Sequence, residues 1–199
     1  MSDVGPEFDL TRICDVSRET IQSLRVYANL LEKWNKTINL VSKSTINHMW
    51  ERHFLDSAQL WPHIPENAKT LVDIGSGAGF AGLVLAIIGK EKNPNLRVVL
   101  IESDTRKCAF MRNVSRETNI NVEIITKRIE EVDDLKADVV TARALATVSQ
   151  LLDYSKNILK KKGICLFLKG DACASELIEA KKSWIFLSKE SQSITHTSG

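Results

Sequence analysis

The fold is decided by residues 71–80, which read Leu-Val-Asp-Ile-Gly-Ser-Gly-Ala-Gly-Phe. A short apolar run leads into three glycines at alternate positions, and an apolar segment of helical length follows from Ala81. Because glycine has no Cβ, such a loop can turn tightly and bring its backbone N–H groups close to a ligand. The order predicts a strand, a ligand-binding turn and a helix, at the place where open parallel sheets bind their ligands.

Two kinds of cofactor are consistent with this loop. Gly77, Gly79 and Gly82 match the dinucleotide fingerprint, with Glu102 as its ribose-binding acid. That fingerprint starts two residues late, however, and leaves Asp73 inside the strand. An acid two residues before three alternating glycines is the usual opening of an S-adenosyl-L-methionine (AdoMet) loop, in which Glu102 can also bind the ribose. We therefore favour AdoMet; the alternatives are a small NAD(P)-dependent oxidoreductase, which would need a further substrate domain, and a turn without a ligand.

The chain after residue 67 alternates between short β-rich runs and segments of helical length. This alternation predicts βαβ units, and therefore an α/β fold with a Rossmann-like parallel sheet and helices on both faces. Two continuously apolar runs, Leu71-Val72 and Val98–Ile101, are typical of strands covered on both sides. The expected strands are 70–74, 97–102, 122–126, 137–143 and 163–169, and the expected helices are 81–89, 105–118 and 147–160.

The first third of the chain predicts helices instead. Apolar residues recur at steps of three and four between Ile21 and Leu31, which is the period of a helix with one apolar face. A second helix is expected to begin at Ser44 or Thr45, either of which can cap it, and to stop at Pro62.

The turn after these helices divides the chain into two parts. They are a helical N-terminal cap, residues 1–66, and an AdoMet-binding domain, residues 67–199. The end of the second part is unusual, because Trp184–Leu187 could form a sixth strand but residues 188–199 are polar. We therefore expect the last strand of the sheet to be missing.

Composition and charge exclude several classes of protein. The 199 residues carry 27 Lys and Arg against 25 Asp and Glu, and a net charge of +2 excludes binding to nucleic acid by overall charge alone. The segment Met1–Arg12 contains no signal sequence, and the longest apolar run, Leu83–Ile88, is too short to cross a membrane. The four cysteines are scattered without zinc-site spacing. We therefore expect a cytoplasmic protein without a metal and, since no coiled-coil pattern occurs, a monomer.

Several short motifs resemble, in order, those of one known family. Residues 31–40 read Leu-Glu-Lys-Trp-Asn-Lys-Thr-Ile-Asn-Leu and residues 52–57 read Arg-His-Phe-Leu-Asp-Ser, and both are more specific than the glycine loop. From about Tyr27 to Gly170 the chain resembles the bacterial 16S ribosomal RNA guanine-N7 methyltransferases, also known as glucose-inhibited division protein B. The other matching pieces are Ile101–Ser103, Arg128–Glu131, Thr141–Leu145 and Lys169-Gly170.

The resemblance implies a fold, a cofactor, a reaction and a site. It implies a methyltransferase sheet with a helical cap, AdoMet as the cofactor, and methyl transfer to N7 of a guanine in 16S ribosomal RNA, either naked or in the small ribosomal subunit. The family's cofactor contacts fall on Gly75, Phe80, Ile129, Glu130 and Arg143. To these the physical argument adds Asp73, Gly77 and Glu102.

Two features depart from the family pattern. Ala81 and Val84 stand where the family usually has prolines, which loosens the start of the helix but removes no ligand. The C-terminus does not resemble the family's closing strand with its arginine and apolar run. A third function therefore stays open, an AdoMet-binding RNA module that has lost catalysis.

The expected chemistry assigns no catalytic residue. N7 of guanine already has a lone pair and no proton, so holding it in line with the methyl group can supply most of the rate. N7 faces a deep groove in A-form RNA, so the target base should be unstacked. Phe80 could attract the sulfonium through its ring, whereas His53 is expected to be a buried structural residue. Two clusters could hold phosphates, namely Lys156, Lys160, Lys161, Lys162 and Lys169, and Arg106, Lys107, Arg112 and Arg116.

Overall fold

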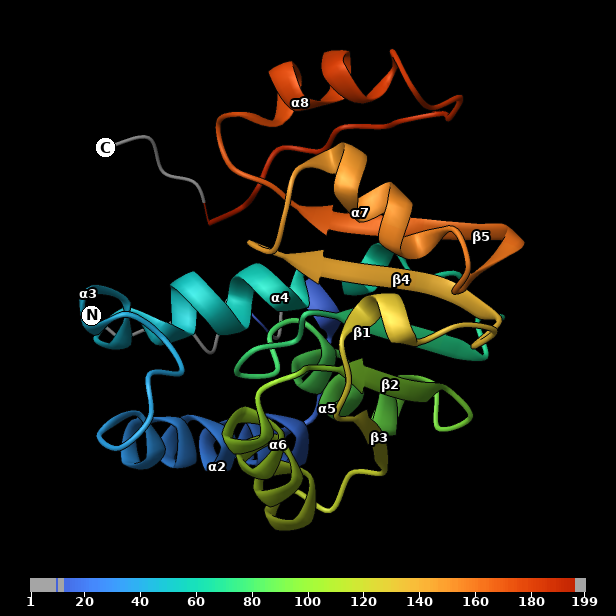
Figure 1. Cartoon of the computed structure of the whole chain (residues 1–199). Coiled ribbons are helices and arrows are strands. Elements are labelled where there is room, and N and C mark those ends of the chain that lie inside the picture. Colours follow the sequence, from blue (N-terminus) through green and yellow to red (C-terminus); the bar gives the residue numbers. More distant parts are fainter. Residues whose placement is uncertain (1–9, 11–12, 196–199) are drawn as a thin grey trace.

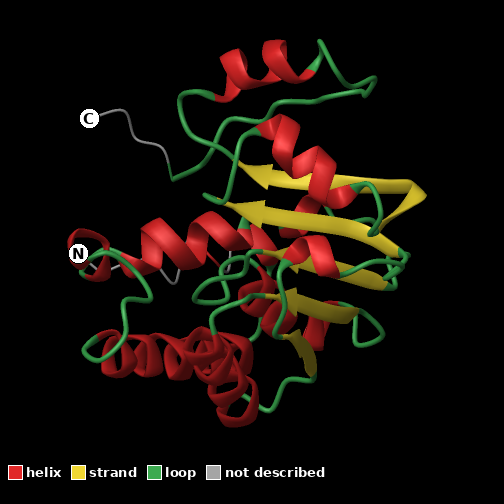
Figure 2. Ribbon diagram, in the orientation of Figure 1, coloured by secondary structure: helices red, strands yellow, loops and turns green. Residues whose placement is uncertain are grey.

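The computed structural model describes residue 10 and residues 13–195 (Figure 1). Within them, five parallel strands form one sheet in the order β3-β2-β1-β4-β5, with helices on both faces (Figure 2). The α/β fold expected from the alternating pattern is therefore present. Most of Met1–Arg12, from which we expected no signal sequence, lies outside the described residues. The strands are β1 (Thr70–Ile74), β2 (Arg97–Ile101), β3 (Val122–Ile125), β4 (Ala137–Arg143) and β5 (Leu159–Leu168).

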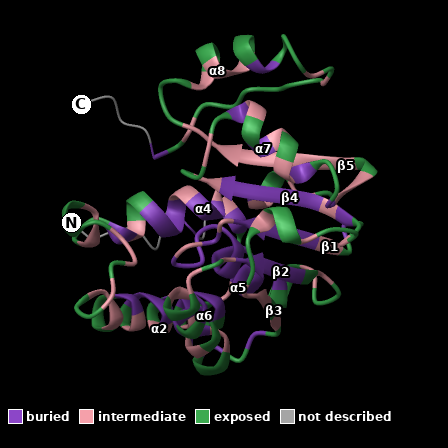
Figure 3. Ribbon diagram, viewed as in Figure 1, coloured by how far each residue is buried: buried purple, intermediate pink, exposed green. Residues whose placement is uncertain are grey.

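Strand β1 lies at the centre of the sheet, and its side chains alternate between two apolar layers. Leu71 pairs with Val98 of β2 and Val139 of β4, and all three belong to the layer that includes the N-terminal helices. Val72 and its neighbours in register, such as Val99, point into the opposite layer, beneath helix α7 (Val148–Ser155). Because both faces are covered, β1, β2 and most of β4 are buried, whereas β5 at the edge is half-buried (Figure 3).

Helix α2 (Arg18–Asn35) confirms the first helical prediction. Ser17 caps it by accepting a hydrogen bond from the backbone N–H of Thr20, and its apolar stripe is buried. This stripe contacts α5 (Gly82–Lys92) and α6 (Thr105–Glu117) on one face of the sheet. The buried residues of α2 are Thr20, Ile21, Leu24, Tyr27, Ala28 and Leu31.

The second N-terminal helix differs from the prediction, because it is broken into short turns. α3 (Lys43–Ile46) is followed by a π-helical turn, η1 (Trp50–Leu55), and by α4 (Asp56–Ala58). Three consecutive residues of the π turn, His53–Leu55, are buried. The turn η2 (Trp61–His63), with Pro62 inside it, ends this region as expected.

The elements after β4 also depart from the prediction. Helix α7 (Val148–Ser155) is shorter than the expected 147–160, because the chain turns at Ile158 and β5 begins at Leu159. Helix α8 (Cys173–Ala180) contacts α7, and the expected sixth strand at Trp184–Leu187 is irregular. Within residues 13–195 no strand follows β5.

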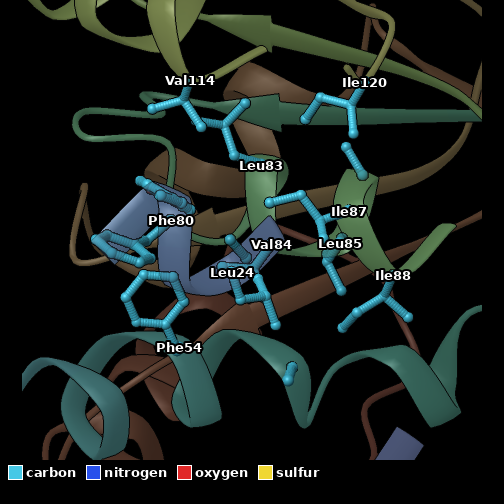
Figure 4. Packing of buried hydrophobic residues seen from close by; sticks show 14 of the residues in the cluster. Leu24, Phe54, Phe80, Leu83, Val84, Leu85, Ile87, Ile88, Val114 and Ile120 are labelled. Atoms are coloured by element: carbon cyan, nitrogen blue, oxygen red, sulfur yellow. The ribbon is translucent and has the colours of Figure 1, made fainter. Parts of the chain in front are cut away.

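The N-terminal helices and the sheet share one hydrophobic core. Figure 4 shows Leu24 and Phe54 from the N-terminal part packed near Phe80 and Leu83 from the glycine loop and α5. The division into residues 1–66 and 67–199 therefore stays a prediction about how the sequence is organised. It does not separate two hydrophobic cores. Among the described residues, no helix is long and apolar enough to cross a membrane.

Candidate functional site

A cleft of about 550 Å³ opens at the carboxyl edge of the sheet. One wall consists of the loops after β1, β2 and β3, and the other consists of residues 40–45, His53 and the segment after β4. Seven of the eight cofactor-binding residues predicted from the sequence line this cleft. The predicted residues that line the cleft are Gly75, Gly77, Phe80, Glu102, Ile129, Glu130 and Arg143.

The glycine loop turns as its sequence predicts. Gly75 has a φ of +62°, and a Cβ at this position would lie 2.6 Å from Leu145 Cδ1. Gly79 has a φ of +93°, and a Cβ there would lie 2.3 Å from Leu83 Cδ1. Both positions therefore favour glycine because of their positive φ, and at Gly79 a Cβ would also displace the buried side chain of Leu83.

Glu102 holds this loop from the end of β2. Its Oε2 accepts a hydrogen bond of 2.9 Å from the backbone N–H of Gly77, and its Oε1 accepts one of 2.8 Å from that of Asp104. A carboxylate offers about four acceptor sites, so these bonds leave room for two more donors. Glu102 can therefore bind a ribose diol while it fixes the loop.

Asp73 lies beneath the loop rather than in the cleft. Its side chain is fully buried, and its Oδ1 accepts a hydrogen bond of 2.7 Å from Thr141 on β4. Burial raises the pKa of Asp73 to about 6, although hydrogen bonds from Thr141, Ser76 and the backbone of Ala81 and Gly82 oppose that shift. Its placement supports a role in holding the start of α5, not a direct contact with a cofactor.

Phe80 forms the centre of an aromatic cluster at the back of the cleft. Its ring is 7% exposed and stacks on Tyr27 at 5.2 Å and on His53 at 5.0 Å. Phe54 meets it edge-on, and the guanidinium of Arg143 lies 5.5 Å from its centre. The cation over Phe80 in this structure is thus an arginine of the protein itself, which the sulfonium hypothesis did not foresee.

Arg143 projects from the end of β4 into the wall between the two halves of the cleft. Its Nε lies 3.4 Å from Asp56 Oδ2, and its Nη2 donates to His53 Nδ1. The remaining nitrogen, Nη1, is buried and has no hydrogen-bond partner among the described residues. Arg143 therefore lines the cleft with one guanidinium nitrogen buried and without a partner among the described residues.

His53 is structural, as the sequence suggested. It is 5% exposed, and burial together with the nearby Arg143 lowers its pKa to about 4. Arginine can only donate hydrogen bonds, so Nδ1 must be the acceptor and Nε2–H must donate to Thr45 Oγ1 at 3.0 Å. A neutral imidazole thus joins Arg143 to the loop that closes the other wall.

Sequence reasoning missed this second wall. Leu40, Val41, Ser42 and Thr45 line the cleft, and the backbone N–H groups of Leu40 and Val41 donate to Asn35 Oδ1 at 2.9 and 3.0 Å. The loss of helical period after Trp34 was the available signal, because it marks the loop that Asn35 folds back toward the sheet.

The two basic clusters are not equivalent. Residues 160–162 occupy the start of β5, and the start of a parallel strand lies at the opposite edge from the cleft (Figure 1). Lys160 pairs with Asp138, Lys156 with Asp153 and Lys169 with Glu176. In the second cluster Lys107 lines the cleft, beside Lys127 and Arg128 from the loop after β3.

Comparison with known proteins identifies the family. The family model for rRNA small subunit methyltransferase G, GidB, matches residues 20–199. The chain belongs to this family. Ribosomal RNA small subunit methyltransferase G of Paramagnetospirillum magneticum is 50% identical over 196 residues, which cover 98% of this chain and 93% of that protein. The resemblance seen in the motifs is therefore confirmed.

Solved structures agree on the fold. Pyrococcus horikoshii TYW2 in complex with MeSAdo gives a TM-score of 0.53 at 14% identity, over 70% of this chain and 50% of that one. Coclaurine N-methyltransferase bound to N-methylheliamine and SAH gives 0.50 at 17% identity, over 81% and 58%. The Rossmann-like methyltransferase fold is confirmed, and as a member of the rRNA small subunit methyltransferase G family the chain is an AdoMet-dependent methyltransferase.

The described residues fit AdoMet on chemical grounds. The cleft combines a loop of glycines with positive φ, a carboxylate with free acceptor sites, and a buried guanidinium nitrogen that has no partner among the described residues. No group of three or more metal-binding side chains occurs among the described residues.

Proposed function

We propose that this chain transfers the methyl group of AdoMet to N7 of a guanine in 16S ribosomal RNA. The observation that carries the proposal is the bond of 2.9 Å between the Gly77 amide and the Glu102 carboxylate, which fixes a ribose-binding acid beside an open glycine loop. It occurs in a chain that belongs to the rRNA small subunit methyltransferase G family. The NAD(P)-dependent oxidoreductase has no comparable support.

The cofactor would occupy the wall formed by the loops after β1, β2 and β3. Glu102 would accept hydrogen bonds from the ribose, and Ile129 and Glu130, in the turn η3 (Ile129–Glu131), would contact the adenine. Gly75 and Gly77 would lie along the methionine part. AdoMet, when bound, supplies a methyl group activated by a sulfonium.

The acceptor guanine would enter from the opposite wall. Residues 40–45 and His53 form this wall, and both ring nitrogens of His53 are engaged, one by Arg143 and the other by Thr45, so neither is free to act as a base. None is needed, because N7 carries a free lone pair. Orientation of reacting groups is worth on the order of 7–11 kcal/mol in well-placed intramolecular reactions. The chain's contribution is thus to hold the base unstacked and in line with the methyl group.

The proposal also covers the form of the substrate, the cell compartment, the oligomeric state and the lack of a metal. The substrate is 16S ribosomal RNA or the small ribosomal subunit, and the protein works in the cytoplasm as a monomer without a metal. Supporting observations are the family match and the basic residues Lys107, Lys127 and Arg128 at the mouth of the cleft, where RNA phosphates would pass.

The test is methyl transfer from tritium-labelled AdoMet to 30S subunits that lack the modification, followed by nucleoside mapping. Label in 7-methylguanosine at a single position of 16S ribosomal RNA is the expected result. Naked 16S RNA in a parallel reaction distinguishes the two forms of substrate. Binding of AdoMet without transfer to either substrate would instead support the module that has lost catalysis. Binding of NADH but not AdoMet in a calorimetric titration would overturn the proposal.

A further inference from the structure

One carboxylate, that of Asp56, joins the cleft wall to a distant part of the chain. It lies in α4, directly after the buried turn that contains His53. We propose that Asp56 is a positioning residue, which holds the Arg143 guanidinium so that its free Nη1 faces AdoMet, and that Thr195 and Gln59 hold Asp56 in turn. This inference rests on AdoMet binding as described under the proposed function.

The first step is the ion pair between Asp56 and Arg143. Asp56 Oδ2 lies 3.4 Å from Arg143 Nε, and both side chains are only 19% exposed. An ion pair shielded from water is weakened less by solvent and salt than a surface pair. The arginine side chain has many rotamers, so a partner that selects one orientation determines where its donors point.

The second step concerns the different partners of the three guanidinium nitrogens. Nε faces Asp56, Nη2 donates to His53, and Nη1 is buried without a partner among the described residues. A buried donor without a partner is unfavourable, because it has lost its hydrogen bonds to water. An acceptor from a bound molecule would remove that cost, and Arg143 lines the proposed cofactor cleft. The first two contacts therefore leave Nη1 as the one guanidinium nitrogen without a partner among the described residues.

The third step concerns the other oxygen of Asp56. Oδ1 accepts a hydrogen bond of 2.8 Å from Gln59 Nε2 and one of 3.1 Å from Thr195 Oγ1. The same Gln59 amide accepts from the backbone N–H of Ile194 at 3.0 Å and donates to Ser193 Oγ at 3.1 Å. Residues 193–195 thus fix the carboxylate from one side while Arg143 occupies the other.

The experiment measures AdoMet affinity by calorimetry in the full chain, without RNA. Asp56→Ala is expected to raise the Kd for AdoMet about tenfold, the effect of losing one hydrogen bond to a charged group. Asp56→Asn keeps the shape and one acceptor, and is expected to raise it about threefold, as is Thr195→Val. Asp153→Ala, which removes the exposed partner of Lys156 on α7, is the matched control and should leave the Kd unchanged.

A double-mutant cycle separates positioning from a merely structural role. If Asp56 acts through Arg143, Asp56→Ala should change the Kd by less than about twofold once Arg143→Gln is present. Equal losses in both backgrounds would overturn the proposal, and so would an unchanged Kd in Asp56→Ala. Should Asp56→Ala fail to fold, the same cycle is run with Asp56→Asn.

A spectroscopic readout keeps this test distinct from that of the proposed function. The Nε–H of Arg143 gives a nitrogen-15 NMR signal that can be assigned with Arg143→Lys. We expect this signal to shift in Asp56→Asn and Thr195→Val but not in Asp153→Ala, with no cofactor added. An unmoved signal overturns the positioning role. If the signal shifts in the two variants but the wild-type chain does not bind AdoMet, the proposed function is overturned and, with it, the cofactor-facing role of Nη1.

Discussion

The hydroxyl of Tyr27 donates a hydrogen bond of 2.6 Å to the carbonyl oxygen of Ala78. Tyr27 lies in the middle of helix α2, and Ala78 lies between the second and third glycines of the loop, so this bond joins the N-terminal helices to the cofactor wall. Both residues are buried, and the ring of Tyr27 also stacks on Phe80. The helical N-terminal part is therefore a support of the glycine loop.

Tyr27→Phe removes this bond and keeps the ring. Because the Ala78 carbonyl would then be buried without its partner, we expect the free energy of unfolding to fall by about 1–3 kcal/mol. The Kd for AdoMet should rise several-fold, as the loop loses its support. Urea unfolding and calorimetry measure the two effects. A variant as stable as the wild type would show that water or a shift of the loop replaces the hydroxyl.

Gly82→Ala tests how closely α5 approaches the sheet. The added Cβ would lie 2.5 Å from Leu100 Cδ2 and 2.9 Å from Asp73 Cβ, so we expect a loss of about 1–3 kcal/mol in the free energy of unfolding. Gly89→Ala is the control on the same helix, because its nearest neighbour would be Trp61 at an ordinary 3.6 Å. There the better helix propensity of alanine should stabilise the protein by about 0.5–1 kcal/mol. Equal effects of the two changes would contradict the close approach.

Glu102→Gln tests the ribose-binding role directly. The amide keeps one oxygen acceptor but lacks the charge and the second acceptor, so we expect the Kd for AdoMet to rise at least about tenfold with the fold intact. Glu123→Gln, which removes an exposed partner of Arg97 on β3, is the control and should not change the Kd. Calorimetry with far-ultraviolet circular dichroism gives both readings. An unchanged affinity in Glu102→Gln would remove Glu102 from the site.

The lowered pKa of His53 predicts that the folded protein loses stability in acid. Its pKa is about 4 in the folded protein, mainly because of burial, against an ordinary value of 6.5. The unfolded chain therefore binds a proton first as the pH falls from 6.5 to 4, and stability present above pH 6.5 is lost in that window. Between pH 7 and pH 5 this amounts to about 2 kcal/mol. Urea unfolding of His53→Gln should show a correspondingly smaller decrease; the same decrease in both proteins would contradict the prediction.

We expect Lys127 and Arg128 to contact RNA phosphates at the mouth of the cleft. Replacement of both by glutamine should raise the KM for 30S subunits several-fold and leave the Kd for AdoMet within about twofold, because phosphate contacts add affinity without reading sequence. The salt dependence of transfer should also become shallower, by about 0.7 in logarithmic slope for each phosphate that the protein no longer neutralises. Lys161→Gln with Lys162→Gln, at the start of β5, is the matched control. A larger effect of the control pair would place the RNA at the other edge.

Predictions of secondary structure from the sequence were most accurate where the local residue types and the final fold favour the same structure. The alternating glycines after an apolar run located β1, the loop and α5, since few other structures use that pattern. The strands were found within one or two residues, apart from β5, whose start was assigned to a helix. Lys160 and its neighbours look helical in isolation, but the ion pair of Lys160 with Asp138 and the pairing of Leu159 with Ala137 place them in the sheet.

The second wall of the cleft could not be predicted in this way. Asp56 and Arg143 are 87 residues apart, and nothing in the spacing of either side chain indicates that they meet. The π-helical turn is equally invisible, because it depends on the space that Phe80 and the sheet leave for His53 and Phe54. Side chains of this kind acquire their roles from tertiary packing.

The hydrogen bond between Thr195 and Asp56 also affects the order in which the sheet and the cleft form during synthesis of the chain. It joins positions 139 residues apart, whereas all five strands lie before residue 169. A nascent chain can therefore pair its whole sheet while the carboxylate that orients Arg143 still lacks its last hydrogen bond. The cleft of a protein that modifies ribosomal RNA is thus completed only after all five strands of its sheet have been synthesised.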